Sequence, residues 1–197
     1  MQHDASDRQS GTGRLIYLVG PSGSGKDSLI DASRERLAAA GVEIARRVIT
    51  RSAEAKGEAA HGVTSEQFEA LREQGAFAMH WRANGLDYGI PLQVDRWLAE
   101  GRAVLVNGSR AYLAEARRRY PNLLAVLVEV RHEVLRERLV ARGRESAEEV
   151  EQRLARNARL QALADPSLHV LDNSTTLETA VEGLFVLLRD EGVLPQV

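Results

Sequence analysis

The chain has 197 residues, of which 44% are apolar and 27% charged, and its formal net charge is −2. This length supports one substantial core, and the balanced charge argues against general affinity for nucleic acids or membrane surfaces. The absence of cysteine excludes disulfides and thiolate metal sites, and no apolar run approaches the length of a membrane span. Residues 1–13 lack the apolar region of a signal peptide. We therefore expect a flexible tail and a single cytoplasmic domain at residues 14–197.

The first predicted strand, Leu15–Val19, leads into a Gly-rich loop at residues 20–27, and a helix-like segment begins near Ser28. The loop matches the pattern G-x-x-x-x-G-K. Its glycines let backbone N–H groups point at a phosphate, the helix N-terminus adds positive potential, and Lys26 can reach the outer phosphates. The pattern therefore predicts ATP binding by the following residues: Gly20, Pro21, Ser22, Gly23, Ser24, Gly25, Lys26, Asp27 and Ser28.

Asp27 stands where this pattern usually has Ser or Thr. Its carboxylate is a hard oxygen ligand that suits Mg²⁺. An acid is also favoured at a helix N-terminus, so a helix-capping role is the alternative. The sequence leaves both interpretations open.

The next elements are a strand predicted at residues 43–50, a loop at 51–62, and a helix opened by a capping box of Thr64 and Gln67. Gly75 ends this helix.

Residues 77–82 alternate between two faces, and Asn84-Gly85 signals a hairpin in which Trp81 faces Tyr88. His80 then lies on the opposite, more polar face. The sequence leaves two interpretations of His80 open, an exposed strand residue or a ligand contact.

A buried strand at residues 103–106 ends in Asn107-Gly108-Ser109-Arg110, and a second apolar strand spans residues 123–130. Ligands bind at the carboxyl edge of a parallel sheet, which makes residues 107–110 candidates for a site.

Ser146 and Glu149 form a second capping box, and the helix that follows carries Arg153, Arg156 and Arg159. These arginines fit either a solvated face, because glutamates accompany them, or a lid that closes over phosphates.

A last strand at residues 168–171 precedes a final helix, which we expect Thr175 and Glu178 to cap. The alternation of strands and helices predicts an α/β protein of the P-loop kinase type, with a parallel five-stranded sheet flanked by helices. Residues 14–50 and 91–197 form its core, with a helical lid at about residues 140–160. Residues 51–90 form an inserted, small β-containing subdomain that binds the acceptor.

These parts suit phosphoryl transfer between two small molecules, in which positioning and charge neutralisation dominate. An alcohol acceptor would need a carboxylate base, whereas the oxygen of a phosphate acceptor is already ionised. No acid in the sequence stands out as a base, which favours a phosphate acceptor.

Residues 20–29, Thr50-Arg51, Gly57-Glu58, Tyr88-Gly89 and residues 138–153 together resemble the guanylate kinase group. The resemblance runs from about residue 15 to residue 188. It implies a phosphate-loop core, a monophosphate-binding insertion and a lid.

By this resemblance, Arg51 and Tyr88 contact the acceptor phosphate, and Arg142 and Arg153 are catalytic lid residues that act with Lys26. The positions that read guanine depart from the group. His80 replaces a glutamate and Asn107 replaces an aspartate. Without these two acceptors, the N–H groups of a bound guanine would lack hydrogen-bond partners. Each buried donor without a partner costs roughly 1–3 kcal/mol, so guanine is a poor substrate by this argument.

Within this group, residues 20–29, 48–51, His80-Trp81, 88–91 and 106–110 resemble the ribose 1,5-bisphosphate phosphokinase family of phosphonate breakdown. The match includes the acid after the lysine. It implies ATP-dependent phosphorylation of the 1-phosphate of ribose 1,5-bisphosphate, giving 5-phosphoribosyl 1-diphosphate, with Mg²⁺.

This second resemblance places Lys26 and Mg²⁺ at the transferred phosphoryl group, Asp27 or Ser28 at the metal, and Arg51 on an acceptor phosphate. The further candidates for ribose and phosphate contacts are Glu58, His61, His80, Tyr88, Asn107 and Arg110. The expected partner is a sugar bisphosphate, with no nucleic acid or membrane, and the oligomeric state stays open. The alternatives are a guanylate or other nucleoside monophosphate kinase, and a non-catalytic binding module of the same fold.

Overall fold

The structure is a computed structural model that describes residues 13–50, 60–143, 145–162 and 165–196. Its main sheet has five strands in the order β2-β7-β1-β8-β9, and every neighbouring pair is parallel. The prediction of a parallel five-stranded sheet is therefore confirmed. The bounds of its strands are β1 Leu15–Val19, β2 Val42–Ile44, β7 Ala103–Asn107, β8 Leu124–Glu129 and β9 His169–Asp172.

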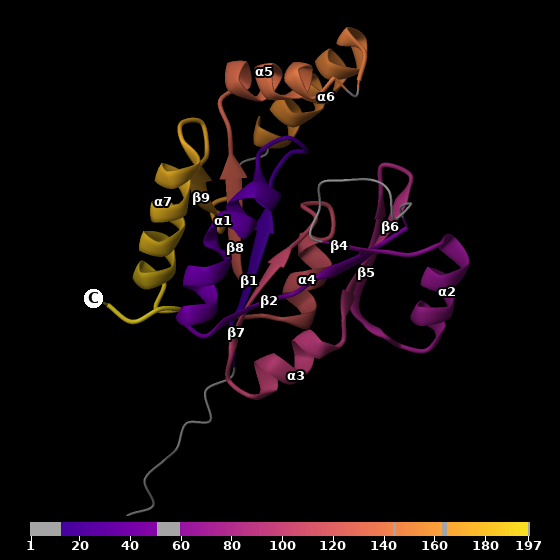
Figure 1. The fold of residues 1–197 in the computed structure, drawn as a ribbon, viewed down its shortest axis with the longest axis vertical. Helices are drawn as coiled ribbons and strands as arrows, with labels where there is room; N and C mark the ends of the chain where they lie inside the picture. The colour runs from indigo at the N-terminus through magenta and orange to yellow at the C-terminus, as the bar shows by residue number, and fades with distance from the viewer. Residues whose placement is uncertain (1–12, 51–59, 144, 163–164, 197) are drawn as a thin grey trace, which may run out of the picture.

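Helices cover both faces of this sheet, because its central strands are apolar on both sides. From β1, Ile16 and Leu18 pack in the cluster that includes α1 (Lys26–Ala39) and α7 (Leu177–Asp190). Tyr17, with the other residues of β1, packs in the cluster that includes α3 (Gln93–Ala99) and α4 (Leu113–Arg119). Because the strands are parallel, their carboxyl ends lie at one edge of the sheet, the upper edge in Figure 1.

A second sheet of four strands lies beside the first, in the order β4-β3-β6-β5 (Figure 1). Its strands are β4 Ala60–Gly62, β3 Arg47–Ile49, β6 Leu86–Pro91 and β5 Phe77–Ala83, and α2 (Ser65–Glu73) is the helix between β4 and β5. The predicted hairpin is confirmed, since Trp81 pairs with Tyr88 and the two rings stack with centroids 5.7 Å apart.

The prediction of one strand over residues 43–50 is wrong. The extended segment is interrupted at Ala45 and Arg46. Before them β2 pairs in the main sheet, and after them β3 pairs in the second sheet. Alternating side chains do not reveal a change of pairing partner, which is why the sequence showed one strand. The second sheet therefore takes in residues before the boundary expected at residue 51.

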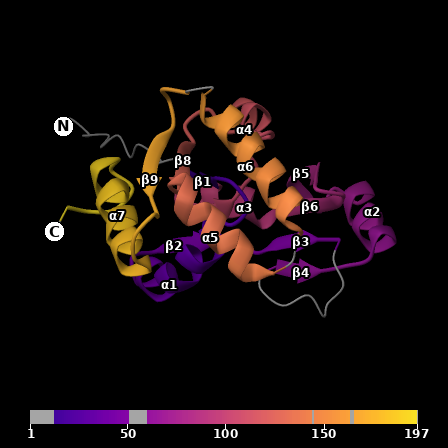
Figure 2. The ribbon, with the colours of Figure 1, turned by 90° about the horizontal axis from the view of Figure 1, so that it is seen from above.

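Helices α5 (His132–Arg142) and α6 (Ala147–Ala162) form a hairpin above the Gly-rich loop, lying across the molecule when it is seen from above (Figure 2). The hairpin has its own apolar cluster, in which Leu135 and Leu139 pack with Val150 and Leu154. The predicted capping box of α6 is confirmed in the structure. The Ser146 N–H donates to Glu149 Oε2 at 2.7 Å, and the Glu149 N–H donates to Ser146 Oγ at 3.3 Å.

The capping box of Thr64 and Gln67 at α2 is confirmed. Within the described ranges, the structure contains no helix with the length and apolarity needed to cross a membrane.

The N-terminal cap of α7 differs from the prediction by one residue. Thr176 occupies the cap position and its Oγ1 accepts a hydrogen bond from the Thr179 N–H at 3.2 Å. The pair of Thr175 and Glu178 predicted from the spacing is therefore wrong, because the helix begins at Leu177.

We predict that Thr176→Ala lowers the free energy of unfolding by about 1 kcal/mol, because the first turn of α7 loses its side-chain acceptor. Thr175→Ala is the matched control and should change it by less than about 0.5 kcal/mol. Urea denaturation followed by far-UV circular dichroism measures both values. Equal effects from the two variants would contradict the assignment of the cap.

Candidate active site

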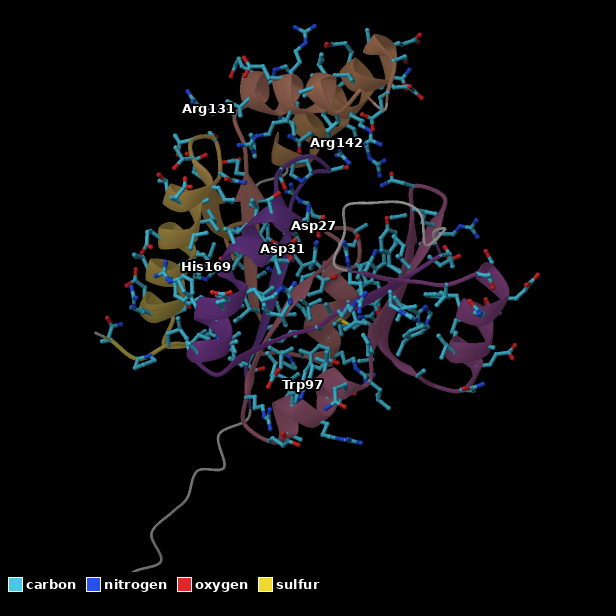
Figure 3. All side chains as sticks on the ribbon, in the orientation of Figure 1. Asp27, Asp31, Trp97, Arg131, Arg142 and His169 are labelled. Atoms are coloured by element: carbon cyan, nitrogen blue, oxygen red, sulfur yellow. The ribbon has the colours of Figure 1, made fainter. Side chains whose placement is uncertain are left out.

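The Gly-rich loop forms the floor of a cavity of about 1250 Å³. The carboxyl end of β7 and the β5–β6 hairpin contribute one side of its lining, and α5 and α6 contribute the other. Arg142 on α5 stands above Asp27 near the start of α1 (Figure 3). The cavity therefore lies between the open edge of the main sheet, the second sheet and the helical hairpin.

Lys26 lies folded over the Gly-rich loop. Its Nζ donates to the carbonyl oxygens of Gly20 and Pro21 at 2.7 and 3.1 Å, and to Ser24 Oγ at 3.4 Å. The side chain of Ser24 is fully buried beneath the loop. The lysine thus holds the loop in shape with the same ammonium group that can meet a phosphate.

Asn173, at the end of β9, supports the loop from below. Its Nδ2 donates to the carbonyl oxygen of Ser24 at 2.7 Å. A Cβ atom at Gly25 would come within 2.5 Å of this amide, and Gly25 also has a φ of +86°. Glycine is therefore required at this position by both backbone conformation and close approach.

Asp27 makes its contacts sideways, toward the end of β7. Asn107 Nδ2 donates to Asp27 Oδ1 at 2.7 Å, and Arg47 Nη2 lies 3.6 Å from the same oxygen. Gly25 is the N-cap of α1, and no side-chain hydrogen bond caps this helix. A hydrogen-bonded cap by Asp27 is therefore not formed, although the carboxylate still lies in the positive first turn.

The donor set at Asp27 fits Mg²⁺. This ion is commonly held by one or two carboxylates together with substrate phosphates, and Asp27 offers one carboxylate beside the loop. Ser28 also lines the cavity and can add a hydroxyl oxygen. Across the described ranges, no group of three or more His, Cys, Asp or Glu side chains could form a protein-only metal site. A metal here would depend on the phosphates of the substrate.

Asn107 has a fixed amide orientation because a carboxylate oxygen can only accept. Its Nδ2 is committed to Asp27, and its Oδ1 is buried without a hydrogen-bond partner among the described residues. Since Asn107 lines the cavity, this oxygen can accept a hydrogen bond from a bound hydroxyl or N–H group. The expectation that Asn107 removes an acceptor from the site therefore needs correction, because only the negative charge is absent.

Tyr17 fixes the backbone that follows Asn107. Its hydroxyl accepts from the Ser109 N–H at 3.0 Å and lies 3.2 Å from the Ser109 carbonyl oxygen, to which it donates. Burial raises the pKa of Tyr17 well above its usual value, so the phenol stays neutral. Gly108 makes room for the ring, since a Cβ there would lie 2.2 Å from it.

Cationic side chains dominate the cavity. The described lining residues include eight cationic groups and only one carboxylate, that of Asp27. The eight are Lys26, Arg47, Arg82, Arg110, Arg138, Arg142, Arg153 and Arg156. In a chain with a net charge of −2, this concentration points to a polyanionic ligand.

The arginines of α6 do not form only a solvated face. Arg153 and Arg156 line the cavity, while the side chain of Arg159 lies outside the described part. Arg153 is paired with Glu145 at 2.9 Å, and Glu145 is largely buried. This ion pair restrains the side chain of Arg153, which lines the cavity.

The structure brings most of the expected site residues to this cavity, including Tyr88, Asn107, Arg110, Arg142 and Arg153. All residues of the loop from 20 to 28 line it except Ser24.

Two of the expected acceptor contacts lie elsewhere. His61 on β4 and His80 on β5 are exposed and do not line the cavity. The structure therefore does not support the assignment of either histidine to the acceptor. Arg51 and Glu58 lie outside the described residues.

The model of the family "Guanylate kinase" matches residues 12–191. Two curated relatives are ribose 1,5-bisphosphate phosphokinases PhnN, from Pseudomonas paraeruginosa at 65% identity and from Azotobacter vinelandii at 63%. Each alignment covers 90% of this chain and 96% of the relative. The chain belongs to the guanylate kinase family, among the ribose 1,5-bisphosphate phosphokinases.

A third relative with the same name, from Thiobacillus denitrificans, is 50% identical over 90% of this chain and 94% of its own length. Among solved structures, a guanylate kinase from Anaplasma phagocytophilum superposes with a TM-score of 0.65. It is 18% identical, and the match covers 92% of this chain and 87% of that one. The solved structure supports the guanylate kinase fold.

Four features of this guanylate kinase family site were not found from the sequence. Arg47 and Tyr17 lie within predicted strands, Arg138 precedes the lid expected at about residues 140–160, and Asn173 follows the last predicted strand. Asn173 follows a strand at the ligand-binding edge, so the rule that selected residues 107–110 would have selected it too. No pattern marks Tyr17, because its role depends on a partner 92 residues away.

We predict that Asn107→Asp lowers the free energy of unfolding by about 1–3 kcal/mol, because it replaces a donor to the half-buried Asp27 carboxylate with a second carboxylate. Adding Asp27→Ser should recover most of the loss, since a hydroxyl can donate to the new acid. Urea denaturation at neutral pH measures both variants. Asn122→Asp, on an exposed turn, is the control and should change stability by less than about 0.5 kcal/mol. Equal losses with and without Asp27→Ser would refute the coupling.

Proposed function

We propose that the protein transfers the γ-phosphoryl group of ATP to the 1-phosphate of ribose 1,5-bisphosphate, giving 5-phosphoribosyl 1-diphosphate and ADP. The observation that carries this function is the identity of 50–65% with relatives of that name over about 90% of the chain. The geometry and charge of the cavity support it independently.

The charge of the cavity suits two phosphate-bearing substrates. One group of cations, Lys26 with Arg138, Arg142, Arg153 and Arg156, comes from the loop and the α5–α6 hairpin. The other group comes from the second sheet and the end of β7. ATP on the first group and a bisphosphate on the second would each meet several positive charges.

The second group consists of Arg47, Arg82 and Arg110. Arg82 and Arg110 line the wall formed by the β5–β6 hairpin and the segment after β7, where the tilted rings of Trp81 and Tyr112 are in contact with centroids 5.6 Å apart. An acceptor with two phosphates would use more of this wall than a monophosphate.

The chemistry needs no general base. An ionised oxygen of the acceptor phosphate attacks the γ-phosphorus, the bond from that phosphorus to the β,γ-bridging oxygen breaks, and ADP leaves with the electron pair. The one carboxylate among the described lining residues, Asp27, is already engaged by Asn107 and Arg47. The absence of a poised acid in the described lining thus agrees with an acceptor that brings its own charged oxygen.

Lys26 and the arginines of the α5–α6 hairpin, which we take as the lid, neutralise the transferred phosphoryl group. Asp27, with Ser28 as a further oxygen, would hold Mg²⁺, and the bound ion would offset the charge of the phosphates. Tyr88, Asn107 and Arg110 would contact the acceptor, with Arg51 as a further candidate outside the described residues.

We predict that ADP release in Mg-ATP is at least about a hundredfold faster, as kcat/KM, with ribose 1,5-bisphosphate than with GMP, AMP or a simple sugar acid. The measurement is coupled ADP detection, with the product identified by mass spectrometry. Lys26→Met is the control and should remove most of the turnover. Good turnover of GMP without turnover of the bisphosphate would refute the proposal, and no turnover with any acceptor would indicate a binding module.

We predict that Asp27→Ala lowers turnover by roughly tenfold or more, and raises the Mg²⁺ concentration needed for half-maximal rate, because a metal ligand is lost. Asp31→Ala is the matched control. Asp31 lies one turn further along α1, is exposed and pairs with Arg34 on the surface (Figure 3). Its removal should leave the Mg²⁺ profile unchanged. A normal Mg²⁺ profile in Asp27→Ala would show that Asp27 does not hold the metal.

A further inference from the structure

Arg47 is a buried cation at the junction of the two halves of the site. The residue is 9% exposed, and it begins β3, the strand by which the chain enters the second sheet. Its guanidinium lies 3.6 Å from Asp27 Oδ1, donates to the Asn107 carbonyl oxygen at 3.4 Å, and stands 5.4 Å from the centre of the Tyr88 ring. These contacts join it to α1, β7 and β6.

A charged group in this position needs a reason, because burying a guanidinium is costly unless it is paired and hydrogen-bonded. The carboxylate of Asp27 supplies that pair, and the need is mutual. Asp27 places a negative charge in a loop built to receive the phosphates of ATP, where the common residue is neutral. Unless the charge is offset, it would repel the nucleotide.

Arg47 suits this task better than the other arginines of the cavity. It belongs to a paired strand, so its contact with Asp27 does not depend on the position of the α5–α6 hairpin. The planar guanidinium can also meet a carboxylate, a carbonyl oxygen and a ring face together, which a lysine ammonium cannot do in one geometry. Asn107 fixes the same carboxylate oxygen from the side.

We propose that Arg47 is a positioning residue that holds the Asp27 carboxylate and offsets its charge, and so permits a phosphate-binding loop with an acid after its lysine to bind ATP. The inference rests on the proposed kinase function but not on the identity of the acceptor. Arg47 and Asp27 then form one unit, in which the arginine is needed because the acid is present.

The first test is the affinity for ATP in EDTA and in Mg²⁺, measured by isothermal titration calorimetry on the full chain. Arg47→Met should weaken metal-free ATP binding by about tenfold or more, because the charge of Asp27 is no longer offset. Arg47→Lys should keep most of that affinity and lose turnover, since lysine retains the positive charge but not the planar set of guanidinium N–H donors. Arg46→Met is the matched control, because Arg46 is exposed and its Nη2 donates to the Ala60 carbonyl oxygen. It should bind ATP normally.

The deciding test is a double-mutant cycle with Asp27→Ser. In that background Arg47→Met should cost less than about threefold in metal-free ATP affinity, because no acid remains to be offset. An equal loss in both backgrounds would overturn the proposal, since it would show that Arg47 binds phosphate directly or only supports the fold. Thermal unfolding without ligand accompanies each variant.

If Arg47→Met does not fold by itself, recovery of folding in Asp27→Ser/Arg47→Met would support the pairing. If neither variant folds, the deciding variant is Arg47→Lys, measured with Asp27 present and with Asp27→Ser. Its turnover, relative to the same background with Arg47, should fall more when Asp27 is present. Equal falls in the two backgrounds would overturn the proposal. None of the ATP affinities involves the sugar acceptor. A failure with ribose 1,5-bisphosphate therefore leaves this test intact.

Discussion

The carboxylate of Asp27 is the constraint around which the site is built. Its Oδ1 receives a hydrogen bond from the end of β7 and the charge of an arginine from the start of β3. One atom thus links the nucleotide-binding loop to the main sheet and to the second sheet. Because a charged group next to a phosphate site must be offset, the choice of one residue in the loop determines which residues can stand at two other places.

The concentration of positive charge in the cavity has its own structural requirement. Arginines in one cavity repel one another, and the α5–α6 hairpin that carries four of them needs support that does not come from the ligand. The hairpin has an apolar cluster of its own, and ion pairs such as Arg136 with Glu151 and Arg153 with Glu145 add opposite charge. Its packing is local, so the hairpin can keep its shape while the cavity is filled or empty.

The sequence predicted most of the fold because the relevant signals are local. Apolar runs gave the parallel strands, and glycines with capping boxes gave the ends of the helices. One error arose where the outcome depends on distant partners. The strand at residues 43–50 splits because β2 and β3 pair with strands from different parts of the chain. The start of α7 shifts by one residue for a local reason, because two adjacent threonines can each act as the N-cap.

The same limit, that contacts between distant residues leave no local signal, applies to the site. The loop and residues 107–110 could be found from motif and position, but the pairing of Asp27 with Arg47 and Asn107 could not. Asn107 keeps an acceptor oxygen in the cavity, so it does not reject a base with N–H groups by itself. Arg47, which only donates, stands beside it and favours anionic or carbonyl groups. Arg47 therefore connects this side of the cavity to the acid of the ATP loop. A substitution on the acceptor side also changes the environment of the loop that binds ATP.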